Sequence, residues 1–194
     1  MSSAASDLIA GLREALKGPL PGHEGFLQLS GWRTAAIDEA RKQDKSPRES
    51  AVLVLLHPAA DTLRTTLIVR PQYDGVHSGQ VAFPGGRWEV GDVDLRSTAL
   101  REAEEEIGVQ GASVEVIGTL STVYIPPSRS LVSPYVGLLP ASPVYRPDAR
   151  EVAEIFEASI SDLLDPTSLG RTQRYVQIVG VDASVPCFKL HGRE

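Results

Sequence analysis

The sequence predicts a single mixed α/β domain of ordinary globular composition. With 194 residues, the chain is long enough for one domain with a sizeable core and short for two. Hydrophobic residues make up 42% and charged residues 23%, as is usual for a folded protein. Runs of strand length alternate irregularly with amphipathic helical stretches, and neither an internal repeat nor a regular βαβ alternation is present.

The first half of the chain contains two predicted helices followed by strands. Residues 6–17 have helical apolar spacing, and glycines and prolines follow them. A second helix is expected near residues 32–42. Residues 51–56 form an uninterrupted apolar run, which suits a strand buried on both faces, and the β-branched residues 62–69 are expected to pair with it in a hairpin. A short strand over residues 80–83 ends at a proline and two glycines.

The second half begins with a predicted helix over residues 95–107, and Gly108 occupies the position where a helix commonly stops. Residues 159–164 are expected to form a short helix. The remaining strands are expected over residues 113–124, 131–139, 151–158, 171–181 and 185–190. We divide the chain into a helical extension, residues 1–45, that packs on one domain formed by residues 46–194.

The charge and the cysteine content exclude several classes of protein. Nineteen basic and twenty-five acidic residues give a net charge of −6, which provides no general attraction to nucleic acid or to an anionic membrane. Cys187 is the only cysteine, so an internal disulfide and a thiolate metal cluster are both excluded. The N-terminus lacks the pattern of a secretory signal, and no apolar run reaches membrane-spanning length. We therefore expect a cytoplasmic protein, whose oligomeric state the sequence leaves open.

Carboxylates are concentrated near the end of the helix predicted over residues 95–107. On a helix, Glu102, Glu105 and Glu106 share one side, where like charges repel one another. Hard divalent cations prefer oxygen ligands and would relieve this repulsion. Arg101 precedes Glu105 by one turn and is placed to hold that side chain. A solvated acidic face is the alternative interpretation of the same residues.

The stretch GRWEVGDVDLRSTALREAEEEIGV resembles the Nudix box, G-x5-E-x7-R-E-U-x-E-E-x-G-U, in which U is aliphatic. Fourteen residues separate Gly86 from Arg101, one more than the general pattern has. The first acidic position therefore falls on Asp92 when counted forwards and on Val93 when counted backwards. The remaining positions of the box are filled by Arg101, Glu102, Ala103, Glu105, Glu106, Gly108 and Val109.

This resemblance implies a Nudix fold, in which a mixed β-sheet is sandwiched between helices, and a diphosphate hydrolase that uses Mg²⁺ or Mn²⁺. It implies that the metal ligands are Glu102, Glu105, Glu106 and the carbonyl of Gly86. The general base is left open between Glu105, oriented by Arg101, and two later acids, Glu151 and Glu154. Those two acids are equally consistent with solvent-facing positions on a strand.

The preceding stretch, LIVRPQYDGVHSGQVAFPGG, resembles the motif of the coenzyme A pyrophosphatase branch, and the longer box is also typical of that branch. The resemblance implies coenzyme A as substrate and contacts from Arg70, Gln80 and Phe83. Gly75 stands where the branch has a second basic residue, and Arg129 is a candidate replacement. Surface positions are the alternative for both arginines.

Two other functions remain open from the sequence. One is a Nudix hydrolase that acts on another nucleoside diphosphate derivative, such as ADP-ribose or NADH. The other is a module that binds a nucleotide without hydrolysing it. The chain also stops at Glu194 without the closing helix of the branch, so either the protein lacks that helix or the sequence is truncated, and we favour truncation.

Overall fold

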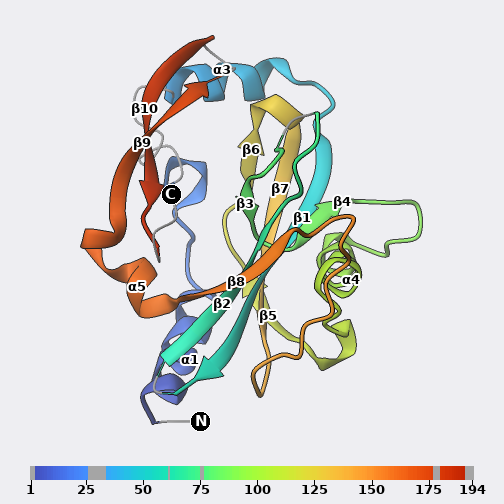
Figure 1. The fold of residues 1–194 in the computed structure, drawn as a ribbon, viewed down its shortest axis with the longest axis vertical. Helices are drawn as coiled ribbons and strands as arrows, with labels where there is room; N and C mark the ends of the chain where they lie inside the picture. The colour runs from blue at the N-terminus through green and yellow to red at the C-terminus, as the bar shows by residue number, and fades with distance from the viewer. Residues whose placement is uncertain (1–2, 26–33, 61, 75–76, 177–179, 191–194) are drawn as a thin grey trace.

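Strands outnumber helices in the computed structural model, which describes residues 3–25, 34–60, 62–74, 77–176 and 180–190 (Figure 1). Trp32, Gly75 and residues 177–179, on which some sequence predictions fall, lie outside this part. The helices are α1 (Ser3–Ala15), α3 (Thr34–Gln43), α4 (Leu95–Ile107) and α5 (Ile160–Leu164). The strands are β1 (Arg48–Ala59), β2 (Thr62–Val69), β3 (Val81–Ala82), β4 (Gly85–Arg87), β5 (Glu115–Thr119), β6 (Val123–Ile125), β7 (Ser130–Leu138), β8 (Glu154–Ser159), β9 (Leu169–Val176) and β10 (Val181–Phe188).

The main sheet is built around β1, as the long apolar run in the sequence predicts. Its central order is β3-β2-β1-β7-β5, and β4, β6 and β8 pair with β1, β7 and β2 respectively. The predicted β1–β2 hairpin is confirmed, with Leu56 opposite Thr65. The pairing of β1 with β7 is parallel, whereas the other pairings in this sheet are antiparallel. The sheet is therefore mixed.

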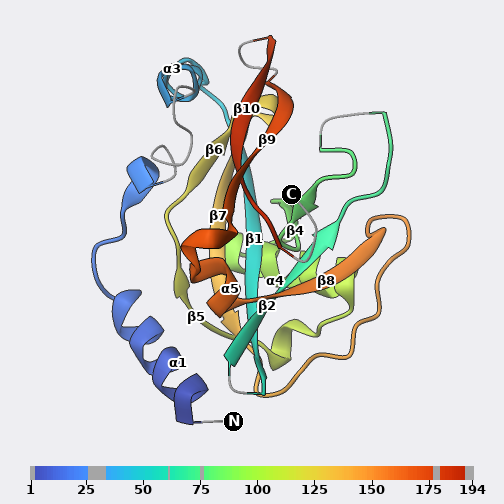
Figure 2. The same cartoon turned by 60° about the vertical axis from the view of Figure 1, so that its left-hand side comes forward.

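Helices cover both faces of this sheet (Figures 1 and 2). Alternate residues of β1, namely Ala51, Leu53 and Leu55, are completely buried in a cluster that includes the apolar side of α4. On the other face, a second cluster joins Leu56 of β1 to the apolar side chains of α1. The predicted arrangement of a mixed sheet between helices is confirmed.

Helix α4 has the same bounds as the helix predicted from the sequence. Asp94 caps its N-terminus: the side chain accepts a hydrogen bond from the Ser97 amide, and the Ser97 side chain binds the Asp94 amide in return. At the other end, Gly108 has a φ of 73°, a left-handed conformation that glycine adopts without strain. Caps at both ends fix the length of the helix that carries the acidic residues.

Several predicted strands differ in their bounds, among them 171–181 and 185–190, which become β9 and β10 with Val181 at the start of β10. The run 113–124 is divided into a 3-10 turn (Gly111–Ser113), β5 and β6. Strand 80–83 is reduced to β3, and residues 85–87 form the separate strand β4. The prediction of a strand from residue 151 is wrong because the amides of Glu151 and Val152 both bond to the Asp148 carbonyl in a turn. Strand β8 begins only at Glu154.

The N-terminal segment contains the helices α1 and α3 and, between them, the non-helical residues 16–21, and the division after residue 45 stays a prediction. Strands β9 and β10 pair only with each other and form a second, two-stranded sheet. Among the described residues, every helix is too short or too polar to cross a membrane.

Candidate active site

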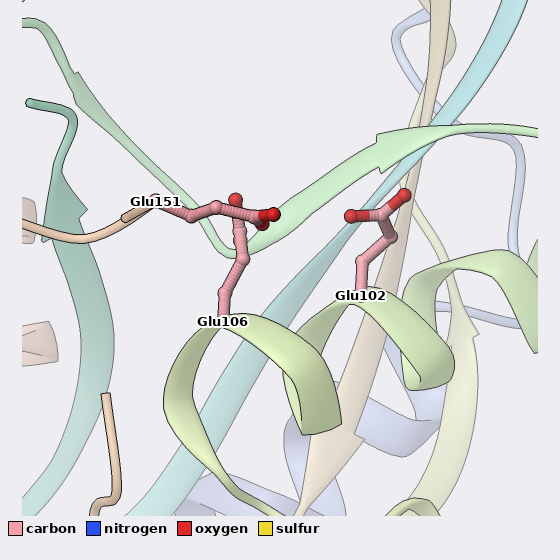
Figure 3. Close-up of side chains that lie close together, drawn as sticks. All are labelled: Glu102, Glu106 and Glu151. Carbon is pink, nitrogen blue, oxygen red and sulfur yellow. The ribbon is translucent and has the colours of Figure 1, made fainter. Parts of the chain in front are cut away.

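Three carboxylates from two distant parts of the chain meet beside β4 (Figure 3). Glu102 and Glu106 lie one turn apart on α4, and Glu151 lies in the turn before β8. One oxygen of each carboxylate lies within 4.8 Å of the others. The structure therefore brings together two of the predicted metal ligands and one of the candidate general bases.

Glu106 is the most deeply buried member of this group, with only 1% of its side chain exposed. Its Oε2 accepts a hydrogen bond of 2.8 Å from the Gly85 amide, and its Oε1 lies 3.4 Å from Nη1 of Arg70. Burial raises the pKa of Glu106 to about 7, although Gly85 and Arg70 oppose this shift. Burial also raises the pKa of Glu102. A charged group at this place is thus only partly compensated by its neighbours.

Two consecutive glycines allow close packing around β4, Gly86 against α4 and Gly85 against β1. A Cβ atom on Gly86 would lie 2.4 Å from the Glu102 carboxylate, and a Cβ atom on Gly85 would lie 2.3 Å from the carbonyl oxygen of Ala51. Position 85, where φ is 154°, therefore requires glycine, whereas a side chain at position 86 would displace the Glu102 carboxylate. The Gly85 carbonyl accepts a hydrogen bond of 3.0 Å from Arg70, which fixes the turn against the buried carboxylate.

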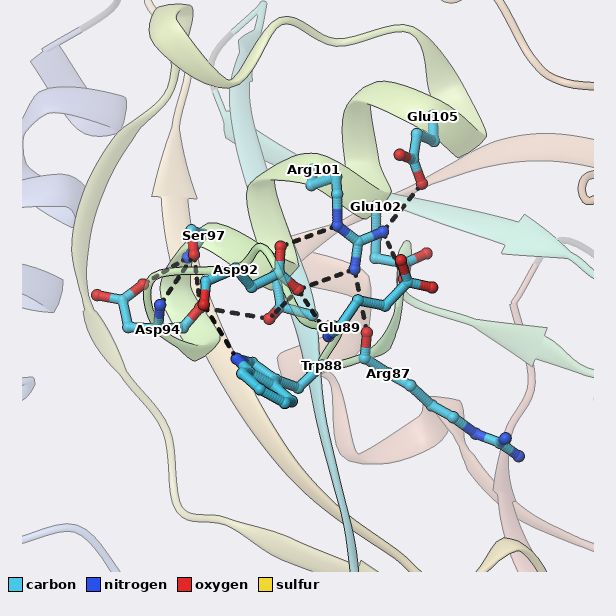
Figure 4. Close-up of polar contacts among 10 residues, drawn as sticks. Arg87, Trp88, Glu89, Asp92, Asp94, Ser97, Arg101, Glu102 and Glu105 are labelled. Atoms are coloured by element: carbon cyan, nitrogen blue, oxygen red, sulfur yellow. Dashed lines mark hydrogen bonds and ion pairs between the residues drawn. The ribbon is translucent and has the colours of Figure 1, made fainter.

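Arg101 organises a different group of acids on the neighbouring side of α4 (Figure 4). It donates to both oxygens of Asp92 at 2.9 and 3.0 Å, and to Glu102 and Glu105 at 3.0 Å each. Hydrogen bonds from Arg101 hold the pKa of Asp92 well below its usual range. Of the two candidates for the first acidic position of the box, Asp92 has a side chain buried against Arg101, whereas Val93 is 92% exposed.

Glu105 and Glu154 lie outside the group of three carboxylates. The side chain of Glu105 is 55% exposed and is held by Arg101, as the sequence predicts. Glu154 begins β8, where it is exposed and lies opposite Val69 of β2. Roles as metal ligand or general base stay predictions for both residues.

A cavity of about 700 Å³ opens beside the carboxylates. Arg70, Gln80, Gly86 and Glu151 line it, together with residues that point from one face of β1 and β7. This lining contains Arg48 and Arg87, which sequence reasoning missed. Arg87 could have been predicted from the sequence because it directly follows the two glycines. Arg48 could be placed in the cavity only once the pairing of the strands was known.

The other two predicted substrate contacts, Phe83 and Arg129, lie outside the cavity lining. Phe83 packs against a small apolar cluster around Leu67 and is not in the cavity lining. Arg129 forms a two-point ion pair with Asp44, whose carboxylate also accepts a hydrogen bond from Tyr124. Contacts from Phe83 and Arg129 to a substrate stay predictions.

Comparisons with known proteins agree with this architecture. The family model described as "NUDIX domain" matches residues 47–175. A protein from Pectobacterium atrosepticum named uncharacterized Nudix hydrolase NudL is 40% identical over 122 residues, which cover 59% of each chain. The chain thus spans less than two thirds of the curated relatives that it matches.

Two solved structures have the same fold. A NUDIX hydrolase from Alicyclobacillus acidocaldarius aligns with a TM-score of 0.53 and 19% identity, over 61% of this chain and 82% of that one. The NUDIX domain of Shewanella oneidensis NrtR, solved in complex with ADP ribose, aligns with a TM-score of 0.51 and 22% identity, over 63% and 79% of the two chains. At these identities the likeness concerns the fold alone.

Proposed function

Because this chain belongs to the Nudix domain family, we propose that it is a metal-dependent hydrolase that cleaves the diphosphate of coenzyme A or of a coenzyme A derivative. The products are 3′,5′-ADP and 4′-phosphopantetheine. The observation that carries the hydrolytic part is the meeting of Glu102, Glu106 and Glu151 at the cavity. The coenzyme A part rests on the motif that runs from Arg70 to Gly86.

The donor set suits a hard divalent cation such as Mg²⁺ or Mn²⁺. Glu102 and Glu106 offer carboxylate oxygens on successive turns, and the Gly86 carbonyl is a further candidate ligand. The raised pKa of Glu106 reflects a buried charge that a cation would compensate. When bound, such an ion neutralises charge on the phosphoryl oxygens and lowers the pKa of a coordinated water.

Glu151 is the favoured proton acceptor in this proposal. It is exposed, whereas Glu106 is buried, so its carboxylate is open to water in the cavity. As the water oxygen forms a bond to phosphorus, the bond from that phosphorus to the bridging oxygen breaks. The proton of the water passes to Glu151, and the second phosphate leaves as a phosphate monoester.

Arg70 and Gln80 supply polar groups to the same cavity. Arg70 is 27% exposed and already contacts Gly85 and Glu106, so its position is fixed before a ligand arrives. Its guanidinium is suited to bind a phosphoryl oxygen of the diphosphate. This contact lowers the electrostatic cost of bringing an anion to a group of carboxylates.

The proposal is tested by incubating the protein and Mg²⁺ with coenzyme A, ADP-ribose, NADH and dinucleoside polyphosphates, and by identifying the products. We expect coenzyme A to give the highest kcat/KM. Faster cleavage of ADP-ribose or NADH would overturn the substrate assignment, and no turnover of any compound would favour a binding module. For substitutions of the acids on α4, Glu104→Gln is the matched control, because Glu104 is an exposed acid of the same helix that lies outside the cavity lining and accepts a hydrogen bond from the Gly111 amide.

A further inference from the structure

Two arginines in the cavity wall have no counter-ion among the described residues. Arg48 and Arg87 line the main cavity and also a neighbouring hollow of about 390 Å³, which Pro47, Glu49 and Trp88 complete. Within the described residues, neither guanidinium forms an ion pair. Arg70 and Arg101, by contrast, are both bound to carboxylates.

Strand pairing places the two arginines on the same face of the sheet. Arg87 of β4 lies opposite Ser50 of β1, and Arg48 precedes Ser50 by two residues. Arg48 and Arg87 are therefore diagonal neighbours, a relation in which residues lie about 7–8 Å apart and long side chains can reach a common ligand. Two unpaired positive charges at this spacing repel each other, and an anion between them would relieve that repulsion.

The backbone around Arg87 is fixed, and its side chain extends away from the Arg101 group (Figure 4). The Arg87 carbonyl accepts a hydrogen bond of 3.0 Å from Arg101, while the Trp88 amide bonds the Glu49 carbonyl at 3.1 Å. The guanidinium is thus presented by a rigid strand edge. Its planar set of donors matches the oxygens of a phosphate group.

Trp88 adds a flat apolar surface to the smaller hollow. Its side chain is 42% exposed, and its indole nitrogen donates a hydrogen bond of 3.2 Å to the Asp92 carbonyl, which limits rotation of the ring. Exposed aromatic rings held in this way stack on nucleobases. Glu49 contributes one carboxylate, so the hollow keeps a net positive charge from its two arginines.

We propose that Arg48 and Arg87 form a second anion site, which binds the phosphomonoester on the ribose of the substrate, with the base placed near Trp88. The inference rests on the proposed function, because coenzyme A carries such a phosphate in addition to its diphosphate. The chain then selects nucleotides with a 3′-phosphate over otherwise identical nucleotides without one. This selection separates coenzyme A from 3′-dephospho-coenzyme A and from ADP-ribose.

The test measures binding of 3′,5′-ADP and of 5′-AMP by calorimetry, in the same Mg²⁺ buffer. Loss of one charge-assisted contact in Arg87→Gln or Arg48→Gln should weaken 3′,5′-ADP binding by about tenfold to a hundredfold. Binding of 5′-AMP should change by less than about threefold, since it lacks the second phosphate. Arg174→Gln, on the exposed part of β9, is the control for the loss of one positive charge. Equal losses for both ligands, or no loss in either variant, would overturn the proposal.

A second measurement separates this inference from the proposed function. We compare kcat/KM for coenzyme A and for 3′-dephospho-coenzyme A, and expect the ratio to fall by about tenfold or more in Arg87→Gln. If wild type cleaves coenzyme A but both variants keep the ratio, the second anion site is refuted alone. If wild type cleaves neither compound, the proposed function fails, and the binding comparison still decides the anion site. Thermal denaturation verifies that both variants are folded.

Discussion

Two groups of acids meet at helix α4 and differ sharply in how their charges are compensated. On one side, Asp92 and Glu105 share the guanidinium of Arg101, and the pKa of Asp92 is lowered. On the other, Glu106 is buried with a single amide hydrogen bond and a 3.4 Å contact to Arg70, and its pKa is raised to about 7. The two groups adjoin each other, because Glu102 touches both.

Within a single motif, this contrast separates acids whose charges an arginine compensates from the acids that we propose as metal ligands. An acid whose charge is paired with an arginine helps to hold the local structure in place. A buried acid that is only partly compensated destabilises the folded protein until a proton or a cation neutralises its charge. The spacing of residues along α4 explains why Glu105 and Glu106 fall into different groups. Residues 101 and 105 share one line along the helix, and residues 102 and 106 share the next.

The largest expected effect comes from Glu106→Gln, which removes the poorly compensated charge and keeps the shape of the side chain. We expect kcat for coenzyme A to fall by about a thousandfold or more, because a lost metal ligand costs several kcal/mol of transition-state stabilisation. Thermal stability without metal at pH 8 should not fall. Near-normal turnover, or a clear drop in the melting temperature, would contradict the distinction between the two groups.

The pH dependence of stability should reveal the same buried charge. Because the pKa of Glu106 is raised from 4.5 to about 7, the folded state holds this proton more tightly than the unfolded state does. The contribution to stability is therefore complete below pH 4.5 and is lost as pH rises through about 7. It amounts to on the order of 3 kcal/mol.

Metal-free urea unfolding of wild type and Glu106→Gln at several pH values measures this contribution as a difference. As the pH rises from 4.5 to about 7, we expect the free energy of unfolding of wild type to fall relative to that of the variant. Mg²⁺ at pH 8 should raise the melting temperature of wild type and leave that of the variant almost unchanged. If the difference in free energy of unfolding between the two proteins does not change with pH, the Glu106 charge does not destabilise the fold.

Glu151→Gln should have the next largest effect, since it removes the favoured proton acceptor. General-base catalysis contributes about a hundredfold or more, so we expect a loss of that size in kcat. Glu154→Gln sharpens the comparison because Glu154 is a neighbouring acid outside the three-carboxylate group. We expect it to retain kcat within about twofold. The reverse order of the two variants would reassign the base to Glu154.

Arg101→Gln removes the guanidinium of the compensated group and should lower kcat less than Glu106→Gln or Glu151→Gln does. It should lower the free energy of unfolding by about 1–2 kcal/mol, less than for a fully buried pair because Arg101 is a quarter exposed. We expect kcat to fall by about tenfold as Glu102 and Glu105 lose their orientation. Chemical unfolding and turnover together distinguish this result from the opposite pattern of Glu106→Gln.

Local patterns predicted the parts of this protein that depend on near neighbours in the chain. The bounds of α4, its left-handed stop at Gly108 and the β1–β2 hairpin all follow from spacing and turn chemistry within a few residues. The side of α4 that carries Glu102 and Glu106 was predictable for the same reason. The same spacing predicted the contact between Arg101 and Glu105, which the structure contains. It did not predict that Glu151 would join Glu102 and Glu106.

The distant residues that join the site could be identified only from the tertiary structure. Glu151 approaches α4 because a turn at Asp148 replaces the expected start of a strand. Arg48 and Arg87 become neighbours because β1 and β4 pair in one register. The acidic helix and the resemblance to the Nudix family could be predicted from the order of residues alone, because both depend on local spacing. The burial of each acid and the charges beside it depend on contacts between distant segments, which local spacing does not contain.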